Sequence, residues 1–482
     1  MRGAERPGCV FLANCLLGLA LVLSSPRLHA EAPCRPTGEQ QLLEAVTRLE
    51  KRVAELEREL GRLTAAGATE GNTHANGEAP GPGAQPQAGP EDLRVFWRRG
   101  LRFETQDKRF ELKVGGRLQC DWAFFDQDER IKAAGDEDDG AEFRRARINF
   151  EGRIYDNVLF RTEYDFAGNS GEAKFKDVYV AVTGLPLVGT LKVGHFREPF
   201  GLERSTGISD HTFMELPLPA VFAPNRNLGV MAHDHALKER LTWAVGAFKD
   251  VDDFPSDDDS DEDQGFAVTG RLTGLPWYEQ DGRRLLHLGI AYSHRNPDGA
   301  VIGWRVRPEA HLANYYLNTE SFEGYRFLEA RMDDVDLWDA EAAFIYGPWL
   351  VQGEYARADV ETTFSRTRHL DGYYVQTSCF LTGEHRPYKT AHGVFGRVVP
   401  KRDFSLQGER GWGAWELALR YSCLDLEDGP IRGGEERNYT AGLNWYLNPS
   451  TRLMLNYVRA TIDHGFYKGD LDVLQTRFQV DF

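Results

Sequence analysis

Two groups of side chains in this 482-residue sequence have types and spacings that could hold a metal ion. His233 and His235 are two residues apart, so on a strand both imidazoles would point to the same face. The run from Asp250 to Asp263 is rich in carboxylates, the ligands that calcium prefers, but it lacks the glycine and the terminal glutamate of an EF-hand loop. For the two histidines we favour the alternative of a surface feature at the end of a strand. For the acidic run we favour the alternative of a solvated loop. The sequence therefore predicts no metal site.

Motifs for catalysis are absent from the sequence. It contains no phosphate-binding Walker loop, no His-Glu-x-x-His, no Gly-x-Ser-x-Gly and no Cys-x-x-Cys. We therefore predict no catalytic residues and no cofactor. Six cysteines are present, too few and too irregularly spaced for a disulfide framework. Three of them are expected on apolar strand faces, where they act as small hydrophobic residues, and these are Cys120, Cys379 and Cys423.

The composition excludes two classes of protein and favours a third. The net charge of -17 would repel a nucleic-acid backbone, so no nucleic-acid partner is expected. No internal apolar run is long enough to span a bilayer as a helix. A hydrophobic content of 41%, with 49 glycines, fits a transmembrane β-barrel, in which each strand presents one face to lipid and the other to water.

The first 30 residues resemble an export signal. Arg2 and Arg6 precede an apolar run from Val10 to Leu23, and Ala30 provides a small residue at a cleavage site. The run is too short to remain in a membrane as a spanning helix. An uncleaved anchor or a lipoprotein signal at Cys15 are the alternatives. We predict a signal peptide over residues 1–30.

A helix and a linker follow the predicted signal. Apolar residues recur at alternating spacings of four and three from Leu42 to Leu63, which predicts a short coiled coil over residues 39–64. Three heptads alone give a coiled coil of marginal stability, and they specify the number of associating helices only weakly. A single amphipathic helix is the alternative. Residues 65–92 are rich in Ala, Gly and Pro and predict a flexible linker.

From residue 103 to 482 the hydrophobic period is two. Between Phe110 and Phe124, for example, the even positions are apolar and most of the odd positions are polar. The same pattern predicts sixteen antiparallel strands that close into a transmembrane β-barrel. Their expected ranges are 110–124, 145–154, 158–166, 174–183, 189–197, 228–238, 240–250, 265–273, 285–295, 336–346, 349–361, 370–382, 410–425, 436–447, 450–462 and 472–482.

The connections and the C-terminus support a barrel over a soluble β-protein. Tight turns such as Gly347-Pro348 alternate with long loops at 198–227, 251–264 and 296–335, as in outer-membrane barrels. A propeller would repeat a blade of roughly 40 to 50 residues, and no such repeat is present. The last strand ends on Phe482, which resembles the signal read by the machinery that assembles barrels into Gram-negative outer membranes. We therefore expect an outer-membrane protein with its coiled coil in the periplasm.

Several short segments resemble the phosphate-selective porin O and P family. They begin at Lys113-Val114-Gly115-Gly116-Arg117 and continue with Phe143-Arg144-Arg145, Lys192-Val193-Gly194-His195-Phe196, Phe200-Gly201-Leu202-Glu203, Leu381-Thr382-Gly383-Glu384, Gly413-Ala414-Trp415-Glu416 and Leu443-Asn444-Trp445-Tyr446. The resemblance implies a trimeric, sixteen-stranded channel with an inward-folded third loop. It also implies basic side chains along a water-filled pore, where they replace part of the hydration that an anion loses.

By this resemblance five arginines are candidate anion or phosphate ligands, namely Arg144, Arg145, Arg204, Arg305 and Arg307. Two adjacent arginines can face the same lumen only where the strand is bulged, so a bulge or strand end is expected there. The alternative is that the arginines form salt bridges with acidic neighbours, which we favour for Arg147, Arg153 and Arg161. Leu216, Glu309 and Ala313 stand where phosphate-specific members have arginine, so anion preference is better supported than phosphate preference.

We therefore expect a passive outer-membrane porin that prefers anions and takes up phosphate or polyphosphate. Its expected partners are small phosphate-like anions, outer-membrane lipid, the barrel-assembly machinery and two further copies of the chain in a homotrimer. The alternatives are a structural anchor tethered through the coiled coil, a non-selective porin, and an outer-membrane hydrolase, which the missing motifs disfavour.

Overall fold

The computed structural model describes residues 92–167, 173–249, 265–296, 303–319, 332–362, 366–407, 411–429 and 431–482. The predicted signal peptide, the coiled coil, all but the last residue of the predicted linker and the acidic run at 250–263 lie outside these residues. Within the described residues, no helix is long and apolar enough to cross a membrane.

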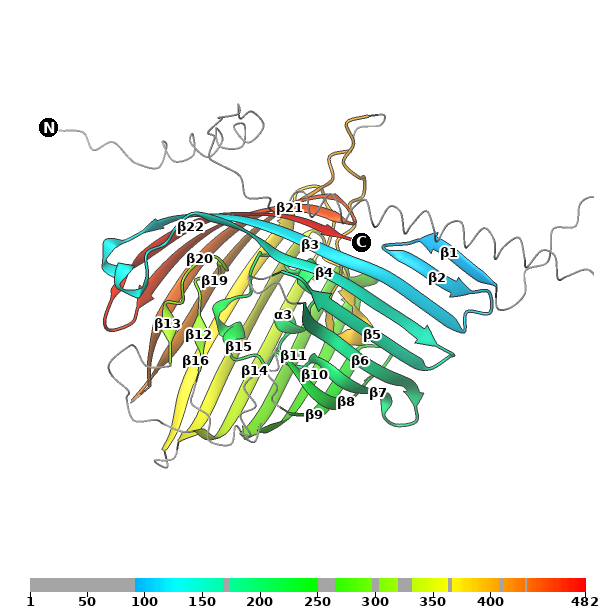
Figure 1. Cartoon of the computed structure of the whole chain (residues 1–482), viewed down its shortest axis with the longest axis horizontal. Helices are drawn as coiled ribbons and strands as arrows, with labels where there is room; N and C mark the ends of the chain where they lie inside the picture. Colours follow the sequence, from blue (N-terminus) through cyan, green and yellow to red (C-terminus); the bar gives the residue numbers. More distant parts are fainter. Residues whose placement is uncertain are drawn as a thin grey trace, which may run out of the picture. The chain divides into compact units, whose positions relative to one another are not determined.

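Sixteen strands of the described chain form a closed antiparallel barrel (Figure 1). Each pairs with its neighbours in sequence, and the last pairs with the first, from Leu471 opposite Gln127 to Asp481 opposite Arg117. This confirms the predicted fold. The strands are β3 (Phe110–Gln127), β4 (Gly140–Ile154), β5 (Val158–Asp165), β6 (Lys174–Leu185), β7 (Gly189–Arg197), β8 (Arg226–Ala236), β9 (Leu241–Lys249), β10 (Phe266–Glu279), β11 (Arg284–Asn296), β14 (Met332–Tyr346), β15 (Trp349–Thr362), β16 (Arg366–Phe380), β19 (Ala414–Asp428), β20 (Ile431–Asn448), β21 (Thr451–Asp463) and β22 (Lys468–Asp481).

The period of two separates an apolar outer face from a polar lumen. In β3, Leu118 and Trp122 are exposed on the outside, whereas Gln119 and Asp121 are buried inside the barrel. Cys120 lies on the same outer face as Leu118, and Cys120, Cys379 and Cys423 are all free thiols, as predicted. The exposed apolar face is the one expected to meet lipid.

A hairpin precedes the barrel and was not predicted from the sequence. It consists of β1 (Leu93–Trp97) and β2 (Leu101–Thr105), and β2 pairs with the start of β3. Residues Glu111 to Val114 of β3 pair with β2, while β22 pairs with β3 only from Arg117 onward. The hairpin therefore covers the part of the β3 edge that extends beyond the last strand.

The lengths of the connections distinguish the two rims of the barrel only in part, because residues 464–467 form a short connection at the rim where β3 ends. At the rim where β3 begins, here called the terminal rim, most turns are short, such as residues 155–157 and 347–348. However, the long segment 381–413 between β16 and β19 also lies at the terminal rim. The predicted separation of short turns and long loops is therefore wrong for this segment. It contains β17 (Tyr388–Lys389), η5 (Thr390–His392) and β18 (Val394–Phe395).

Two other segments enter the lumen from the opposite rim. Segment 198–225 contains α3 (Leu202–Ser205), η2 (Ile208–Asp210) and η3 (Leu218–Val221), and it crosses the lumen to β19, where the Leu218 N–H donates to Ser422 Oγ at 3.3 Å. Segment 303–319 contains β12 (Arg305–Val306) and β13 (Leu317–Asn318). Both pack into one apolar core with the wall: Phe200 comes from the first segment, Tyr316 from the second and Val360 from β15.

Segments 198–225 and 381–413 are joined by one buried arginine. Arg386 donates to Asp210 O at 2.7 Å, to Thr212 Oγ1 at 2.9 Å and to Glu416 Oε1 at 2.5 Å. Because the guanidinium is fully buried, its three acceptors and the Glu416 charge are needed to offset its desolvation. The lumen is thus narrowed by segments that enter from both rims and meet inside it.

Candidate functional site

The adjacent arginines of β4 lie at a β-bulge. Gln119 of β3 pairs with Arg145, and the next residue, Cys120, pairs with Phe143, so Arg144 is the extra residue. Phe143 is exposed on the outer face, whereas Arg144 and Arg145 both turn inward. The predicted bulge is confirmed, since a regular strand would place the two guanidiniums on opposite faces.

Arg144 forms an ion pair with segment 198–225 inside the barrel. Its Nε and Nη2 donate to the two carboxylate oxygens of Glu215 at 2.9 and 3.0 Å. Arg477 of β22 donates to Glu215 Oε1 at 2.7 Å and also pairs with Asp121. Burial raises the pKa of Glu215, but Arg144, Arg477 and Arg145 outweigh it and hold that pKa well below its ordinary value. Glu215 therefore stays ionised, and the charge of Arg144 is largely compensated.

Arg145 has a different environment from Arg144. Its Nη1 donates to Gln119 Oε1 at 2.7 Å, its Nε has no hydrogen-bond partner, and no carboxylate of the described residues pairs with it. The side chain is only 8% exposed. A nearly buried guanidinium with unused donors and no counter-charge is suited to bind an anion.

Arg307 lies near the same end of β4. Its Nη1 donates to the carbonyl of His311, and its guanidinium lies 4.3 Å from the ring centre of Tyr315. The His311 ring is in turn 2.7 Å from Glu142, two residues before Arg144. Segment 303–319 thereby places Arg307 beside the bulge, while Arg305 is exposed on β12.

Arg204 is separate from this group. It lies in α3, where its Nη2 donates to Ala223 O at 3.0 Å. The five predicted arginines therefore do not form one cluster. Arg144, Arg145 and Arg307 lie near the bulge. Arg204 lies in α3, near the start of segment 198–225.

The three positions that depart from the phosphate-specific pattern have structural roles or neighbours. Glu309 is buried and pairs with Arg420, so its negative charge is compensated. Ala313 is buried in the core that holds segment 303–319, and Leu216 is half-buried beside Glu215.

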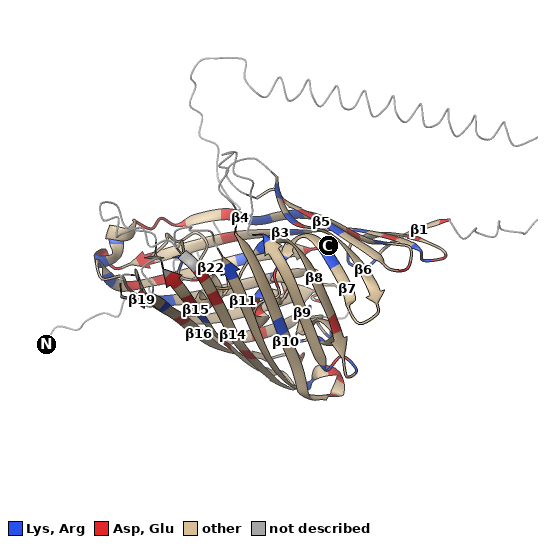
Figure 2. Ribbon diagram, turned by 90° about the horizontal axis from the view of Figure 1, so that it is seen from below, with Lys and Arg blue, Asp and Glu red and all other residues tan. Residues whose placement is uncertain are grey.

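A cavity of about 450 Å³ lies between strands β3 to β10 of the wall and segments 198–225 and 381–413. Four acidic side chains line it, which are Glu163, Asp177, Glu198 and Asp234. Its lining also contains eight basic side chains, which are Arg117, Arg147, Arg161, Lys192, Arg197, Arg226, Arg271 and Lys389. Figure 2 shows how such basic and acidic positions are interleaved along the strands. Six of these cations are paired with carboxylates, so Lys192 and Arg197, which have no acidic partner among the described residues, are the ones that make the cavity suited to anions.

None of the eight basic cavity residues was among the candidate ligands predicted from the sequence. Arg197 donates to the carbonyls of Arg204 and Thr206, and Lys192 lies 4.6 Å from the ring centre of Tyr179. Neither forms an ion pair with a carboxylate of the described chain. Lys192 and Arg197 are five residues apart, so regular alternation along β7 would place them on opposite faces and could have identified only one of them as a lumen residue.

Other wall arginines are paired with acids, as predicted. Arg147 binds Glu163 and Asp165 at 2.9 and 2.7 Å, and Arg161 binds Glu151 at 2.8 Å. Arg153 also pairs with an acid, at 3.3 Å, although its partner is Glu111 of β3. These cations hold neighbouring strands together rather than adding free charge to the lumen.

Comparison with known proteins identifies the family. A family model described as phosphate-selective porin O and P matches residues 112–482. The chain belongs to this family. Porin O of Pseudomonas aeruginosa is 28% identical over 77% of this chain and 88% of its own length. An uncharacterized protein of Caulobacter vibrioides is 30% identical over 78% of this chain and 73% of its own length.

Solved structures give the same fold. An anion-selective porin from Comamonas acidovorans aligns with 77% of this chain and all of its own, with a TM-score of 0.50 and 13% identity. Family and barrel together place the porin in the outer membrane, and both are those of channel proteins.

Proposed function

We propose that the porin is a passive, water-filled channel that prefers anions to cations. The cavity of about 450 Å³, in whose lining Lys192 and Arg197 have no acidic partner among the described residues, carries this proposal. In a narrow lumen with low-dielectric walls, fixed positive charge raises the local concentration of anions and lowers that of cations. The name of the Comamonas acidovorans structure, an anion-selective porin, agrees with it.

Cations without an acidic partner supply the preference. Arg145, Arg197 and Lys192 each lack an ion pair with the described residues, whereas Arg144 is compensated by Glu215. We assign direct contact with the passing anion to Arg145. Arg144 shares this role in part and positions segment 198–225 through Glu215.

The other predicted arginines extend the path. Arg305 and Arg307 lie on segment 303–319, which enters from the rim opposite the terminal rim, and Arg204 lies on segment 198–225. We propose that Arg305 and Arg307 draw anions inward toward the bulge, and that Arg204 receives them beyond it. Planar guanidiniums suit the oxygens of phosphate, so phosphate and polyphosphate are the proposed physiological anions.

Reversal potentials in planar bilayers test the anion preference. In a potassium chloride gradient, Arg145→Ala and Arg197→Ala should each lower the ratio of chloride to potassium permeability. Arg459→Ala is the matched control, because Arg459 is exposed on the outer face and pairs there with Asp470 and Asp472. A wild-type channel without anion preference would overturn the proposal.

Phosphate selectivity needs its own measurement. Phosphate added to a chloride-conducting channel should block the current at low millimolar concentration or below, and Arg145→Ala should require more phosphate for the same block. An equal block in the wild type and the variant would place Arg145 outside the phosphate site while leaving anion preference intact.

We also propose that the porin works as a homotrimer whose predicted coiled coil lies in the periplasm. Family membership supports this assembly. Chemical cross-linking of intact outer membranes should give a product of three chains, and a monomer or dimer as the largest product would contradict it.

A further inference from the structure

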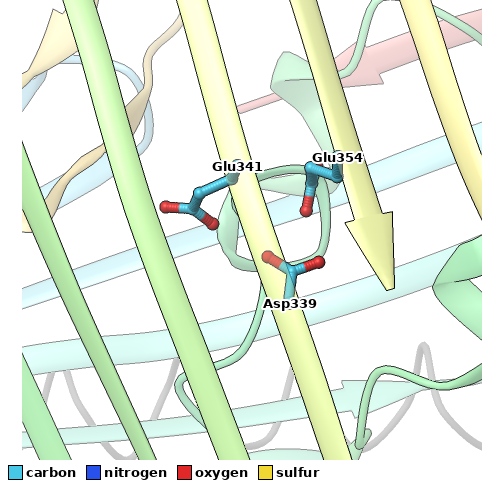
Figure 3. Close-up of side chains that lie close together, drawn as sticks. All are labelled: Asp339, Glu341 and Glu354. Carbon is cyan, nitrogen blue, oxygen red and sulfur yellow. The ribbon is translucent and has the colours of Figure 1, made fainter. Parts of the chain in front are cut away.

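Three carboxylates meet inside the barrel wall, away from the arginine bulge. Asp339 and Glu341 lie on the lumen face of β14, and Glu354 lies opposite them on β15. All three are buried, and one oxygen of each lies within 4.8 Å of the others. Figure 3 shows the Asp339 carboxylate turned toward those of Glu341 and Glu354.

Two of the carboxylates have partners. Glu341 accepts from Arg271 Nη2 at 2.6 Å and lies 3.0 Å from His287 Nε2. Glu354 accepts from the backbone N–H groups of Leu202 and Glu203 at 2.8 Å each, and from the Tyr374 hydroxyl. Arg271 is the single side-chain cation paired with the group among the described residues.

Asp339 has no partner at all within the described chain. It is 6% exposed, forms no hydrogen bond or ion pair, and its buried Oδ1 is unsatisfied. Glu203 of α3 has a second buried and unsatisfied oxygen, Oε1, and lines the same small cavity of about 10 Å³ as Asp339 and Glu354. An unpaired buried carboxylate is expensive, so a group of this kind requires a counter-charge.

The spacing of the oxygens identifies a suitable counter-charge. Calcium is bound by carboxylate oxygens at about 2.3 to 2.6 Å, so oxygens up to roughly 4.6 to 5.2 Å apart can touch one ion. Magnesium, at about 2.0 to 2.1 Å, spans less and demands stricter geometry. Oxygens within 4.8 Å of one another therefore fit calcium better.

We propose that Asp339, Glu341 and Glu354 bind one calcium ion in the wall of the barrel. The ion links β14 to β15 and, through the Glu354 carboxylate that caps α3, to the start of the inward segment 198–225. It also offsets a concentration of negative charge that would otherwise face the path of an anion. The site stands on its own geometry and does not depend on the anion preference proposed above.

Calcium binding to the full-length porin tests the site directly. The protein is refolded in detergent without lipopolysaccharide, depleted with EGTA and dialysed against radioactive calcium. The wild type should bind one more calcium per chain than Asp339→Asn. The matched control is Asp336→Asn, since Asp336 lies on the outer face of the same strand and is partly exposed, and it should bind as the wild type does. Equal binding of calcium by Asp339→Asn and the wild type would overturn the proposal. It would indicate that protons, and not calcium, neutralise the three carboxylates.

A second measurement needs no variant. Calcium should slow proteolysis within segment 198–225 of the EGTA-treated wild-type porin, and magnesium at the same concentration should have a smaller effect. An identical proteolysis rate with and without calcium would also count against the site. If Asp339→Asn fails to form a heat-resistant barrel, this comparison alone decides the matter.

Discussion

Glu309 and Arg420 form a buried ion pair that fastens segment 303–319 to β19. The Arg420 Nε donates to Glu309 Oε2 at 3.1 Å, and Ser422 and Thr440 donate to the same carboxylate at 2.6 and 2.7 Å. The negative charge of Glu309 is thus compensated by side chains of the wall strands β19 and β20. Its carboxylate stands where arginine was expected in phosphate-specific members, but it serves as an anchor and does not add free negative charge to the lumen.

Glu309→Gln should destabilise the barrel more than an exposed ion pair would. The substitution leaves the buried Arg420 guanidinium uncompensated, which costs about 3 to 5 kcal/mol in comparable cases. The denaturant midpoint of the folded barrel measures this loss. Glu309→Gln combined with Arg420→Gln should recover part of it, because both charges are then removed.

The control for this pair is Glu435→Gln. Glu435 pairs with Arg437 on the partly exposed outer face of β20, where an ion pair contributes about 1 kcal/mol or less. Equal effects of the Glu309 and Glu435 variants would show that segment 303–319 is not held by its ion pair.

Arg144 and Glu215 should have opposite effects on ion selectivity. Glu215→Gln removes a negative charge beside Arg144 and Arg477 and should raise the ratio of anion to cation permeability. Arg144→Ala should lower it. One unit charge at about 4 Å in water corresponds to about 1 kcal/mol, or roughly a fivefold change in the ratio.

The double variant Arg144→Ala with Glu215→Gln should return close to the wild-type ratio, as measured by reversal potentials. If the two single substitutions both lower the ratio, the pair acts through the position of segment 198–225 and not through charge.

Most of the barrel could be predicted because alternation along a strand is a local property. Each of the sixteen predicted ranges overlaps one barrel strand, and even the bulge at Arg144 followed from the rule that neighbours point to opposite faces. The hairpin of β1 and β2 was missed, although Leu93, Val95 and Trp97 alternate, because the segment is short and follows a linker.

The interior of the lumen could not be predicted in this way. Segment 381–413 has no strand period, and its path depends on contacts such as that of Arg386 with Asp210, 176 positions away in the sequence. The pairing of Glu215 with Arg144, and of Glu309 with Arg420, depends in the same way on how loops fold back. Nor does the sequence reveal that Asp339, Glu341 and Glu354 converge, since acidic residues on lumen faces are common throughout the chain.

Gly116 and Phe482 are closely packed where the barrel closes. Their backbones exchange two hydrogen bonds, of 2.8 and 3.0 Å, and a Cβ on Gly116 would lie 2.5 Å from Phe482 Cζ and 2.8 Å from Arg147 O. Gly116→Ala should therefore displace the terminal ring or the backbone of β4. We expect a smaller fraction of heat-resistant barrel in gel electrophoresis without boiling.

Gly270→Ala is the matched control for this glycine, because its added Cβ would lie no closer than 3.6 Å to Ala244 O. A normal yield of folded Gly116→Ala would indicate that the terminal aromatic can move aside without loss.

His211 should make the stability of the barrel sensitive to mild acid. Its ring is buried in segment 198–225, with Nε2 3.1 Å from Thr206 O, and burial together with the nearby Arg197 holds its pKa well below the ordinary value of 6.5. Between that lowered pKa and about 6.5 the unfolded chain binds a proton that the folded chain does not, so stability falls as the pH falls through this window.

His211→Gln should remove this dependence, since a glutamine amide can still donate to Thr206 O but does not titrate. Above pH 7.5 the difference in unfolding free energy between the two proteins should be constant. Below pH 6.5 the wild type should lose up to about 1.4 kcal/mol per pH unit relative to the variant, as measured by denaturant titrations. His235→Gln is the control, because that side chain is 42% exposed near the end of β8. Parallel stability profiles for wild type and His211→Gln would mean that the folded barrel accepts the proton, which requires segment 198–225 to leave its place beside Arg197.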